Sequence, residues 1–220
     1  MLATFIFTLP GTPYIYQGEE IGMTNIAYSN IEDYRDVETL NYYREMKEKG
    51  IPEEEIMEAI YRDSRDNART PIQWDDSRNA GFTEGEPWIK VNPNYKEINI
   101  ERARNNSDSI WNYYRNIIQI RKANPTLIYG DYIPLLPTSE KIFSYLRKDK
   151  NGTYLVILNF TGDKVKDIIK IAGINGYNWK LLANNYNLDN KNNNLVGNNV
   201  FEIKLAPYEA RLYKLSAKNS

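Results

Sequence analysis

Side chains capable of chemistry are concentrated in residues 65–76, which read RDNARTPIQWDD. The segment has a proline at its centre and no apolar period, so neither a regular helix nor a strand is expected. An arginine fork can clamp a carboxylate or two neighbouring sugar hydroxyls, and Arg65 and Arg69 are both candidates. Both could equally form structural ion pairs. Their nearest acidic partners in the sequence are Asp63, Asp66 and Asp75.

Two acidic pairs allow further alternatives. Glu19 and Glu20 follow the apolar run PYIYQG, residues 13–18, which is typical of a buried strand. They are either exposed acids at a turn or carboxylates at the mouth of a parallel barrel, where active sites lie at the carboxyl ends of strands. Asp75 and Asp76 could hold a metal, but no further ligands occur at a suitable spacing, which favours a solvated turn.

Two tryptophans near this segment also have two interpretations. Trp74 and Trp88 could belong to the core or could serve as platforms on which sugar rings stack. The core interpretation is favoured, because large aromatic side chains are buried more often than not.

Composition excludes several classes of function. The 220 residues contain no histidine and no cysteine, so Ser-His-Asp catalysis, thiol nucleophiles and zinc-thiolate sites are not available within them. With 28 basic and 29 acidic residues there is no basic excess for nucleic acid. No phosphate-binding loop, dinucleotide fingerprint or zinc spacing occurs, so we expect no cofactor and no metal. No apolar run is long enough to cross a bilayer, and we expect a cytoplasmic protein with no membrane partner.

The first part of the chain has the pattern of helices and loops. We expect an apolar helix to end near residue 9 and two helices at 32–49 and 52–64. A long segment with little periodicity covers about 65–105. The clearest helix is 108–123, in which Ile110, Tyr114, Ile117, Ile118 and Arg121 fall on or near one face.

The pattern changes near residue 129 to short runs rich in β-branched and aromatic residues, separated by Gly and Asn turns. TYLVILNF, residues 153–160, is apolar almost throughout and predicts a central strand. KIFSYLRK, residues 141–148, has apolar residues on both faces, which leaves its register open. We therefore expect an α+β chain with a boundary between residues 128 and 129. Its second part, residues 129–220, is expected to be a small antiparallel β-sandwich.

Several long motifs carry a family resemblance. They are GTPYIYQGEEIGM at 11–23, YRDVETLN at 34–41, RDNARTPIQWDD at 65–76, NAGFTEGEPWIKVNPNY at 79–95 and APYEARLYKL at 206–215. In this order they resemble the α-glucosidase branch of the α-amylase superfamily. The resemblance implies a (β/α)8 barrel followed by an antiparallel β domain. Residues 1–128 would hold the last barrel strand, at 13–18, with its flanking helices, and residues 129–220 the β domain.

The resemblance also implies a function. Family members hydrolyse α-glucosidic bonds with retention, and the expected substrate is a short oligosaccharide with α-1,6 linkages. The three catalytic carboxylates of the family would lie upstream of Met1, so the chain alone is expected to be inactive. Arg69 matches the arginine that reaches the nonreducing glucose, Asp66 would orient it, and Glu38 would lie near the next sugar. Glu19 and Glu20 would line the barrel mouth.

Two other functions are compatible with the sequence. The chain could be a non-catalytic β-sandwich module that binds carbohydrate or a protein partner, or one part of a split enzyme completed by the missing N-terminal part of the barrel. The sequence does not choose between isomaltose-type sugars, sucrose and trehalose 6-phosphate.

Overall fold

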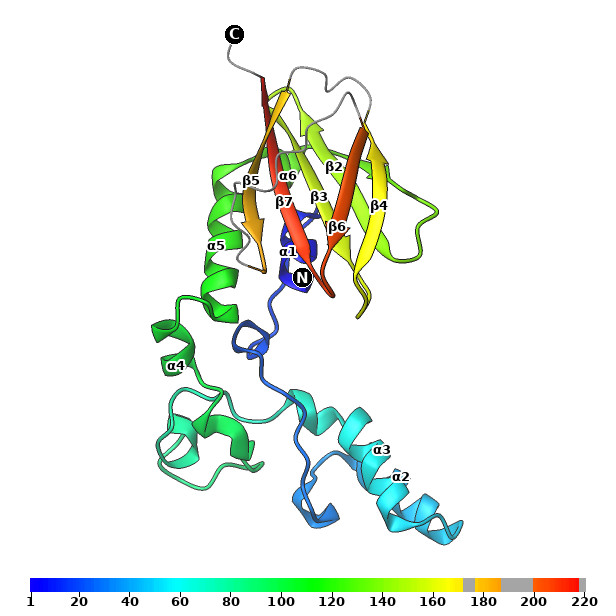
Figure 1. Ribbon diagram of the computed structural model, residues 1–220. Helices are drawn as coiled ribbons and strands as arrows, with labels where there is room; N and C mark the ends of the chain where they lie inside the picture. The colour runs from blue at the N-terminus through cyan, green and yellow to red at the C-terminus, as the bar shows by residue number, and fades with distance from the viewer. Residues whose placement is uncertain (172–176, 187–199, 218–220) are drawn as a thin grey trace. The chain divides into compact units, whose positions relative to one another are not determined.

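The computed structural model describes residues 1–171, 177–186 and 200–217 (Figure 1). The chain divides into two compact units. We call Met1–Tyr14 with Tyr113–Ser220 the strand unit, and Ile15–Asn112 the loop unit. These units are defined by contacts within the fold. The boundary predicted at residue 128 was placed where helices give way to strands, so the two divisions are not comparable and the predicted boundary stays a prediction. No helix in the described ranges has the length and apolar character to cross a membrane.

The described residues of the strand unit form three helices and two antiparallel sheets. Its helices are α1 (Leu2–Thr8), α5 (Ile110–Ala123) and α6 (Thr126–Tyr129). A five-stranded sheet has the order β1-β2-β3-β7-β5, and β4 pairs with β6 in a second sheet. The strands are β1 (Asp131–Leu135), β2 (Ile142–Asp149), β3 (Gly152–Asn159), β4 (Val165–Lys170), β5 (Tyr177–Asn184), β6 (Val200–Leu205) and β7 (Ala210–Ala217).

The central position of β3 confirms the strand predicted from its apolar run. It pairs with β2 on one side and β7 on the other. Because side chains alternate across a strand, Leu155 and Ile157 join a cluster with Val165, Ile169 and residues of β6. Val156 and Leu158 join a second cluster with side chains of α1 and α5. The apolar run of β3 is continuous because both of its faces are covered.

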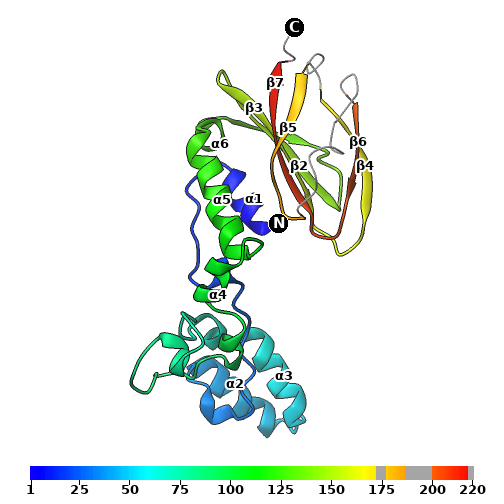
Figure 2. The same cartoon turned by 60° about the vertical axis from the view of Figure 1, so that its left-hand side comes forward.

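The same arrangement explains the open register of β2. Ile142 and Leu146 face the cluster shared with β4 and β6, whereas Tyr145 faces the cluster shared with α1 and α5. Figure 2 shows α1 and α5 on one side of the five-stranded sheet and β4 and β6 on the other. Edge strand β1 was not predicted. Pro134 lies in β1, and an edge strand tolerates a residue without a backbone N–H.

Two buried arginines satisfy the carbonyl groups at the ends of short helices. Arg121 donates from Nη1 to the carbonyls of Phe7, Leu9 and Leu127 and from Nη2 to that of Gly11. Arg147, with 0% of its surface exposed, donates to the carbonyls of Thr8, Leu127, Ile128 and Gly130. The last carbonyl groups of a helix have no hydrogen-bond donor within the helix. Here the guanidinium groups of Arg121 and Arg147 are those donors.

The loop unit is built around a pair of helices. They are α2 (Val37–Glu48) and α3 (Glu53–Asp63), which confirm the two helices predicted there, although α2 begins five residues later than expected. The further elements are η1 (Glu19–Ile21), η2 (Ile31–Asp33), η3 (Arg65–Ala68), η4 (Arg78–Gly81), η5 (Pro93–Lys96) and α4 (Ile100–Asn105). The core of this unit consists of Ile26, Tyr28, Tyr34, Ile56, Ile60 and Ile89.

The strand predicted at residues 13–18 is wrong. These residues have no regular structure up to a turn at Gln17, and 84% of the Tyr14 surface and 59% of the Tyr16 surface are exposed. A barrel strand is stabilised by ladder hydrogen bonds to neighbouring strands. No strand of the described residues pairs with this segment, so its strand-like sequence has no ladder to join.

Candidate functional site

Arg69 is held by two carboxylates at the end of η3. Its Nη1 donates to Oδ1 of Asp36 at 3.0 Å and lies 3.6 Å from Oδ1 of Asp66. The Arg69 side chain is 40% exposed, while the two acids are almost fully buried. Among the described residues only Nη1 of this guanidinium has a partner. Nε and Nη2 are therefore left as a pair of parallel donors, which suits two neighbouring hydroxyls.

Asp66 organises the backbone around this arginine. It is 0% exposed, and its Oδ2 accepts hydrogen bonds from the backbone N–H groups of Arg35 at 2.6 Å and Asp36 at 3.0 Å. The Ser64 hydroxyl accepts from the Asp66 N–H and caps η3. One buried carboxylate thus fixes the start of α2 relative to the loop that carries Arg69. The predicted pairing of Arg69 with Asp66 is present, at the longer of its two distances.

Asp36 is a functional candidate that the sequence analysis missed. Its Oδ2 accepts from the N–H and hydroxyl of Thr39, so it caps α2, while its Oδ1 binds Arg69. Burial opposes ionisation of this carboxyl, but the hydrogen bonds from Thr39 and Arg69 outweigh it and hold the pKa of Asp36 below its usual value. The available signal was the spacing of Asp36 and Thr39, an N-cap pattern three residues apart.

The low pKa of Asp36 predicts acid sensitivity of the loop unit. A carboxyl whose pKa is lower in the folded state stabilises fully above its unfolded pKa and loses that contribution as pH falls through the folded pKa. We expect the stability of the loop unit to decline below about pH 4. Asp36→Asn keeps a good cap but removes the charge, so it should flatten this decline. Urea unfolding between pH 2.5 and 6 measures it, with the exposed Asp76→Asn as control; equal slopes for Asp36→Asn and the unsubstituted chain would contradict the prediction.

Glu38 lies on the first turn of α2 and forms an exposed ion pair with Arg65 at 3.2 Å. Both side chains line a cavity of about 270 Å³ between α2 and α3, together with Asp36 and Tyr42. Arg65 therefore pairs with Glu38, and not with the nearby aspartates considered from the sequence. An exposed pair of this kind contributes little to stability, so Glu38 can exchange Arg65 for another polar partner at small cost.

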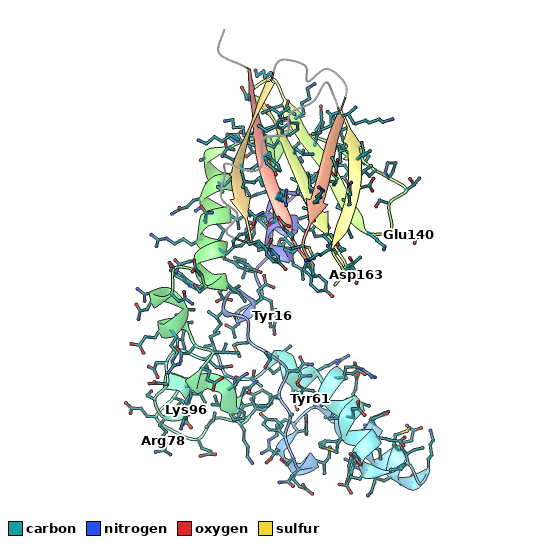
Figure 3. All side chains as sticks on the ribbon, viewed as in Figure 1. Tyr16, Tyr61, Arg78, Lys96, Glu140 and Asp163 are labelled. Atoms are coloured by element: carbon teal, nitrogen blue, oxygen red, sulfur yellow. The ribbon has the colours of Figure 1, made fainter. Side chains whose placement is uncertain are left out.

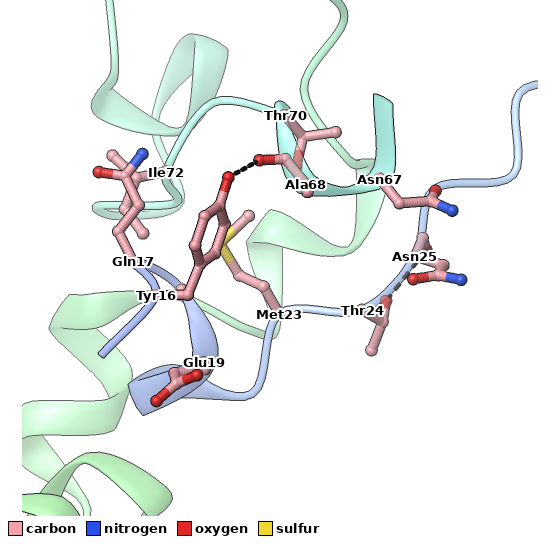
Figure 4. Close-up of a pocket in the computed structure, with 11 residues that line it drawn as sticks. Tyr16, Gln17, Glu19, Met23, Thr24, Asn25, Asn67, Ala68, Thr70 and Ile72 are labelled. Atoms are coloured by element: carbon pink, nitrogen blue, oxygen red, sulfur yellow. Dashed lines mark hydrogen bonds between the residues drawn. The ribbon is translucent and has the colours of Figure 1, made fainter. Parts of the chain in front are cut away.

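Glu19 and Glu20 lie in η1, and their surroundings differ. An oxygen of Glu20 accepts from the backbone N–H of Gly18 at 2.7 Å. Glu19 lines a second cavity, of about 230 Å³, which we call the Tyr16 cavity (Figure 4). It is formed by residues 16–19, 23–25, 67, 68, 70 and 72. Arg69 does not line this cavity, although both of its chain neighbours do, so Arg69 and the cavity lie on different sides of the loop.

The remaining candidates lie in the strained turn that follows Arg69. Asn79 and Ala80 have φ values of 54° and 57°, and the Ala80 carbonyl accepts from the N–H of Trp74 at 2.9 Å. Asp75 accepts from the backbone and hydroxyl of Ser77, which agrees with the solvated turn that was favoured. No cluster of potential metal ligands occurs in the ranges that the structure describes.

The core interpretation of the two tryptophans is wrong. Trp74 is 50% exposed and Trp88 is 60% exposed. The core of the loop unit is filled by isoleucine and tyrosine side chains from α2, α3 and the segments beside them. Neither tryptophan belongs to that cluster.

Comparison with known proteins identifies the family. The family model described as the α-amylase catalytic domain matches residues 1–130. The chain belongs to the α-amylase family. This finding confirms the resemblance that the motifs carry, and the loop with Arg69 lies within the matched region.

Relatives of this α-amylase family member are glycoside hydrolases. It is 48% identical over 217 residues to the oligo-1,6-glucosidase of Parageobacillus thermoglucosidasius, covering 98% of this chain and 37% of the relative. It is 42% identical over 219 residues to the trehalose-6-phosphate hydrolase of Bacillus subtilis (strain 168), with 98% and 37% coverage. The crystal structure of Bacillus licheniformis trehalose-6-phosphate hydrolase matches with a TM-score of 0.86 at 44% identity, covering 99% of this chain and 38% of that one. The chain thus spans little more than a third of the length of these relatives.

Proposed function

We propose that this chain is the sugar-recognition part of a retaining α-glucosidase that acts on α-1,6-linked short oligosaccharides. The observation that carries the proposal is the Arg69 guanidinium, fixed on one nitrogen by Asp36 and Asp66 with its other donors left for a ligand. Fixed orientation matters because a fork that is already ordered loses little entropy when it binds two hydroxyls. The α-1,6 preference is supported by the high identity to the oligo-1,6-glucosidases.

The catalytic carboxylates are proposed to come from polypeptide other than these 220 residues. Retaining hydrolysis uses two carboxyl groups about 5–5.5 Å apart, one as nucleophile and one as acid/base. The two buried acids beside Arg69 are occupied by that guanidinium and by backbone N–H groups. The role left to this chain is binding, with Arg69 on the nonreducing glucose, Glu38 near the next sugar, and Glu19 and Glu20 at the barrel mouth.

This function implies a particular architecture. We propose that residues 1–128 complete a (β/α)8 barrel, in which the segment 13–18 becomes the last strand once neighbouring strands supply its ladder. Residues 129–220 form the C-terminal β domain, with its two sheets packed as a sandwich. The proposed enzyme requires no cofactor and no nucleic acid or membrane partner, and it works in the cytoplasm.

A chimera tests the function. The part of the Parageobacillus thermoglucosidasius oligo-1,6-glucosidase that precedes the matched region would be joined to this chain. The chimera is expected to hydrolyse isomaltose, and the 220 residues alone are not. In the chimera, Arg69→Ala should lower kcat/KM about 10- to 100-fold, the effect of one charged hydrogen-bonding group.

The matched control is Arg44→Ala, which removes an exposed arginine of α2 that lines neither of the two cavities. It should leave kcat/KM within about twofold. Turnover of isomaltose by the 220 residues alone would show that the catalytic carboxylates have been placed wrongly. An active chimera that is insensitive to Arg69→Ala would remove this arginine from the site.

A further inference from the structure

The connector that follows α1 reads LPGTP and contains one flexible joint. Pro10 and Pro13 have a φ that is fixed by their rings. Leu9 and Thr12 each precede a proline, which disfavours the helical region for both of them, and Leu9 is extended. Gly11 has a φ of 98°, a left-handed conformation that glycine adopts readily. The direction of the chain after α1 therefore depends on Gly11.

Arg121 holds the chain on both sides of this joint. Its Nη1 donates to the Leu9 carbonyl at 3.0 Å, and its Nη2 donates to the Gly11 carbonyl at 2.6 Å. Nη1 also donates at 2.8 Å to the carbonyl of Phe7, within α1. The guanidinium is planar and rigid, so hydrogen bonds from its two ends fix these carbonyls relative to one another. The left-handed turn at Gly11 is thus locked by a side chain that is only 6% exposed.

The helix that carries Arg121, α5, is itself fixed to α1. The hydroxyls of Thr4 and Tyr113 share a hydrogen bond of 2.6 Å, and the rings of Phe7 and Tyr114 pack edge to face with their centroids 5.9 Å apart. A positioning group is precise when the element beneath it is rigid. All of these partners belong to the strand unit and are bonded or packed there, so the lock is complete within that unit.

A small rotation at the joint is amplified along the segment that it directs. Tyr16 (Figure 3) lies five residues beyond Gly11. In the proposed last strand of the barrel each residue adds about 3.3 Å, so a rotation of about 10° at Gly11 would displace Tyr16 by roughly 3 Å. A misplacement of about 1 Å in an enzyme site can lower the rate roughly 100-fold. The angle at Gly11 therefore matters for the site that the strand helps to form.

We propose that Arg121 is a positioning residue of the site: by locking Gly11 it sets the direction in which the last barrel strand continues from α1, and with it the place of Glu19 and Glu20. What is positioned rests on the proposed function. The lock itself does not, because each of its hydrogen bonds lies within the strand unit. Arg121 contacts no substrate in this proposal, and its effect on hydrolysis passes through the strand that it directs.

Arg147 provides the matched control for the lock. It is also buried and donates to four carbonyls, but only that of Thr8 belongs to α1 and none lies in the connector. At either position lysine keeps the charge but not the planar fork. In the 220-residue chain, NMR relaxation should give order parameters of about 0.85 for the Gly11 and Thr12 amides. They should fall below about 0.6 in Arg121→Lys and stay unchanged in Arg147→Lys; equal values in the two variants would overturn the lock.

Gly11→Ala tests the positioning in the chimera with the oligo-1,6-glucosidase. A Cβ at Gly11 would meet nothing within 4 Å among the described residues, so the change disfavours the left-handed turn without disturbing packing. We expect KM for isomaltose to rise and kcat/KM to fall about tenfold. Loss of folded enzyme would lower kcat without changing KM, so the rise in KM separates positioning from stability.

The control for this variant is Gly50→Ala, in the turn between α2 and α3. Gly50 has a φ of 77° and also has nothing within 4 Å of a Cβ, so the backbone strain is matched while the joint is intact. KM should stay within about twofold of the unsubstituted chimera. Equal KM values in Gly11→Ala and Gly50→Ala would overturn the positioning role. An unsubstituted chimera that does not hydrolyse isomaltose would contradict the proposed function instead, and the order parameters would still decide whether Arg121 locks the joint.

Discussion

Replacing Arg147 with methionine is expected to lower the free energy of unfolding of the strand unit by about 3–5 kcal/mol. The guanidinium is fully buried and donates to four backbone carbonyls. Methionine fills a similar volume but donates nothing. The carbonyls of Thr8, Ile128 and Gly130 would lose this donor, and a buried polar group without a partner costs about 1–3 kcal/mol.

One effect acts in the opposite direction. Burial lowers the pKa of Arg147, and Arg121 nearby carries the same charge, so removing one cation relieves some desolvation and repulsion. The carbonyl losses outweigh this relief, because three groups are affected at once and the helix ends lie in the interior. The Leu127 carbonyl retains its bond from Arg121. The free energy of unfolding of Arg147→Lys should lie between those of the unsubstituted chain and Arg147→Met, because lysine keeps the charge but not the two-pronged guanidinium donor.

Hydrogen exchange of β3 amides measures this effect without assuming that the two units unfold together. The control is Lys148→Met in the same strand, where the side chain is exposed and the change should stay within about 0.5 kcal/mol. Equal protection of β3 in Arg147→Met and Lys148→Met would show that the buried guanidinium does not hold the helix ends.

The strands of the second part were predictable because their patterns are local. TYLVILNF is apolar on both faces, and β3 is covered on both faces. The register of β2 could not be settled for the same reason, since Ile142 and Tyr145 both face a core. Arg121 was predicted to lie on the apolar face of its helix, and it is buried there. Nothing in the alternating run around Arg147 distinguishes it from an exposed strand arginine.

Features that depend on distant partners could not be predicted. Residues 13–18 have a strand composition, but a strand forms only with a ladder, which a local pattern does not report. The tryptophans were assigned to the core from their size, although burial depends on what packs around them. In the site, the sequence left Asp63, Asp66 and Asp75 as possible partners of Arg69, and it was the family resemblance that implied Asp66. Asp36 was missed because the predicted helix began too early, which hid its position directly before Val37.

Asp66→Asn is expected to lower the free energy of unfolding of the loop unit by about 2–4 kcal/mol. Oδ2 accepts two backbone N–H groups, and Oδ1 lies 3.6 Å from Nη1 of Arg69. An asparagine that kept its oxygen toward those N–H groups would turn its NH2 toward the guanidinium, placing donor against donor. The reverse orientation would leave the N–H groups of Arg35 and Asp36 without an acceptor. Both orientations lose the charge that opposes Arg69, and the second also loses two buried hydrogen bonds.

The amide protons of Arg35 and Asp36 report this change directly, because both donate to the carboxylate that is altered. Their hydrogen exchange should accelerate in Asp66→Asn by more than that of amides in the middle of α3. Asp63→Asn is the matched control, since Asp63 is 65% exposed and bonded to Arg62, and it should change stability by less than about 0.5 kcal/mol. If the two variants were equally stable, the buried carboxylate would not be what orders Arg69, and the donors proposed to bind sugar would lack their support.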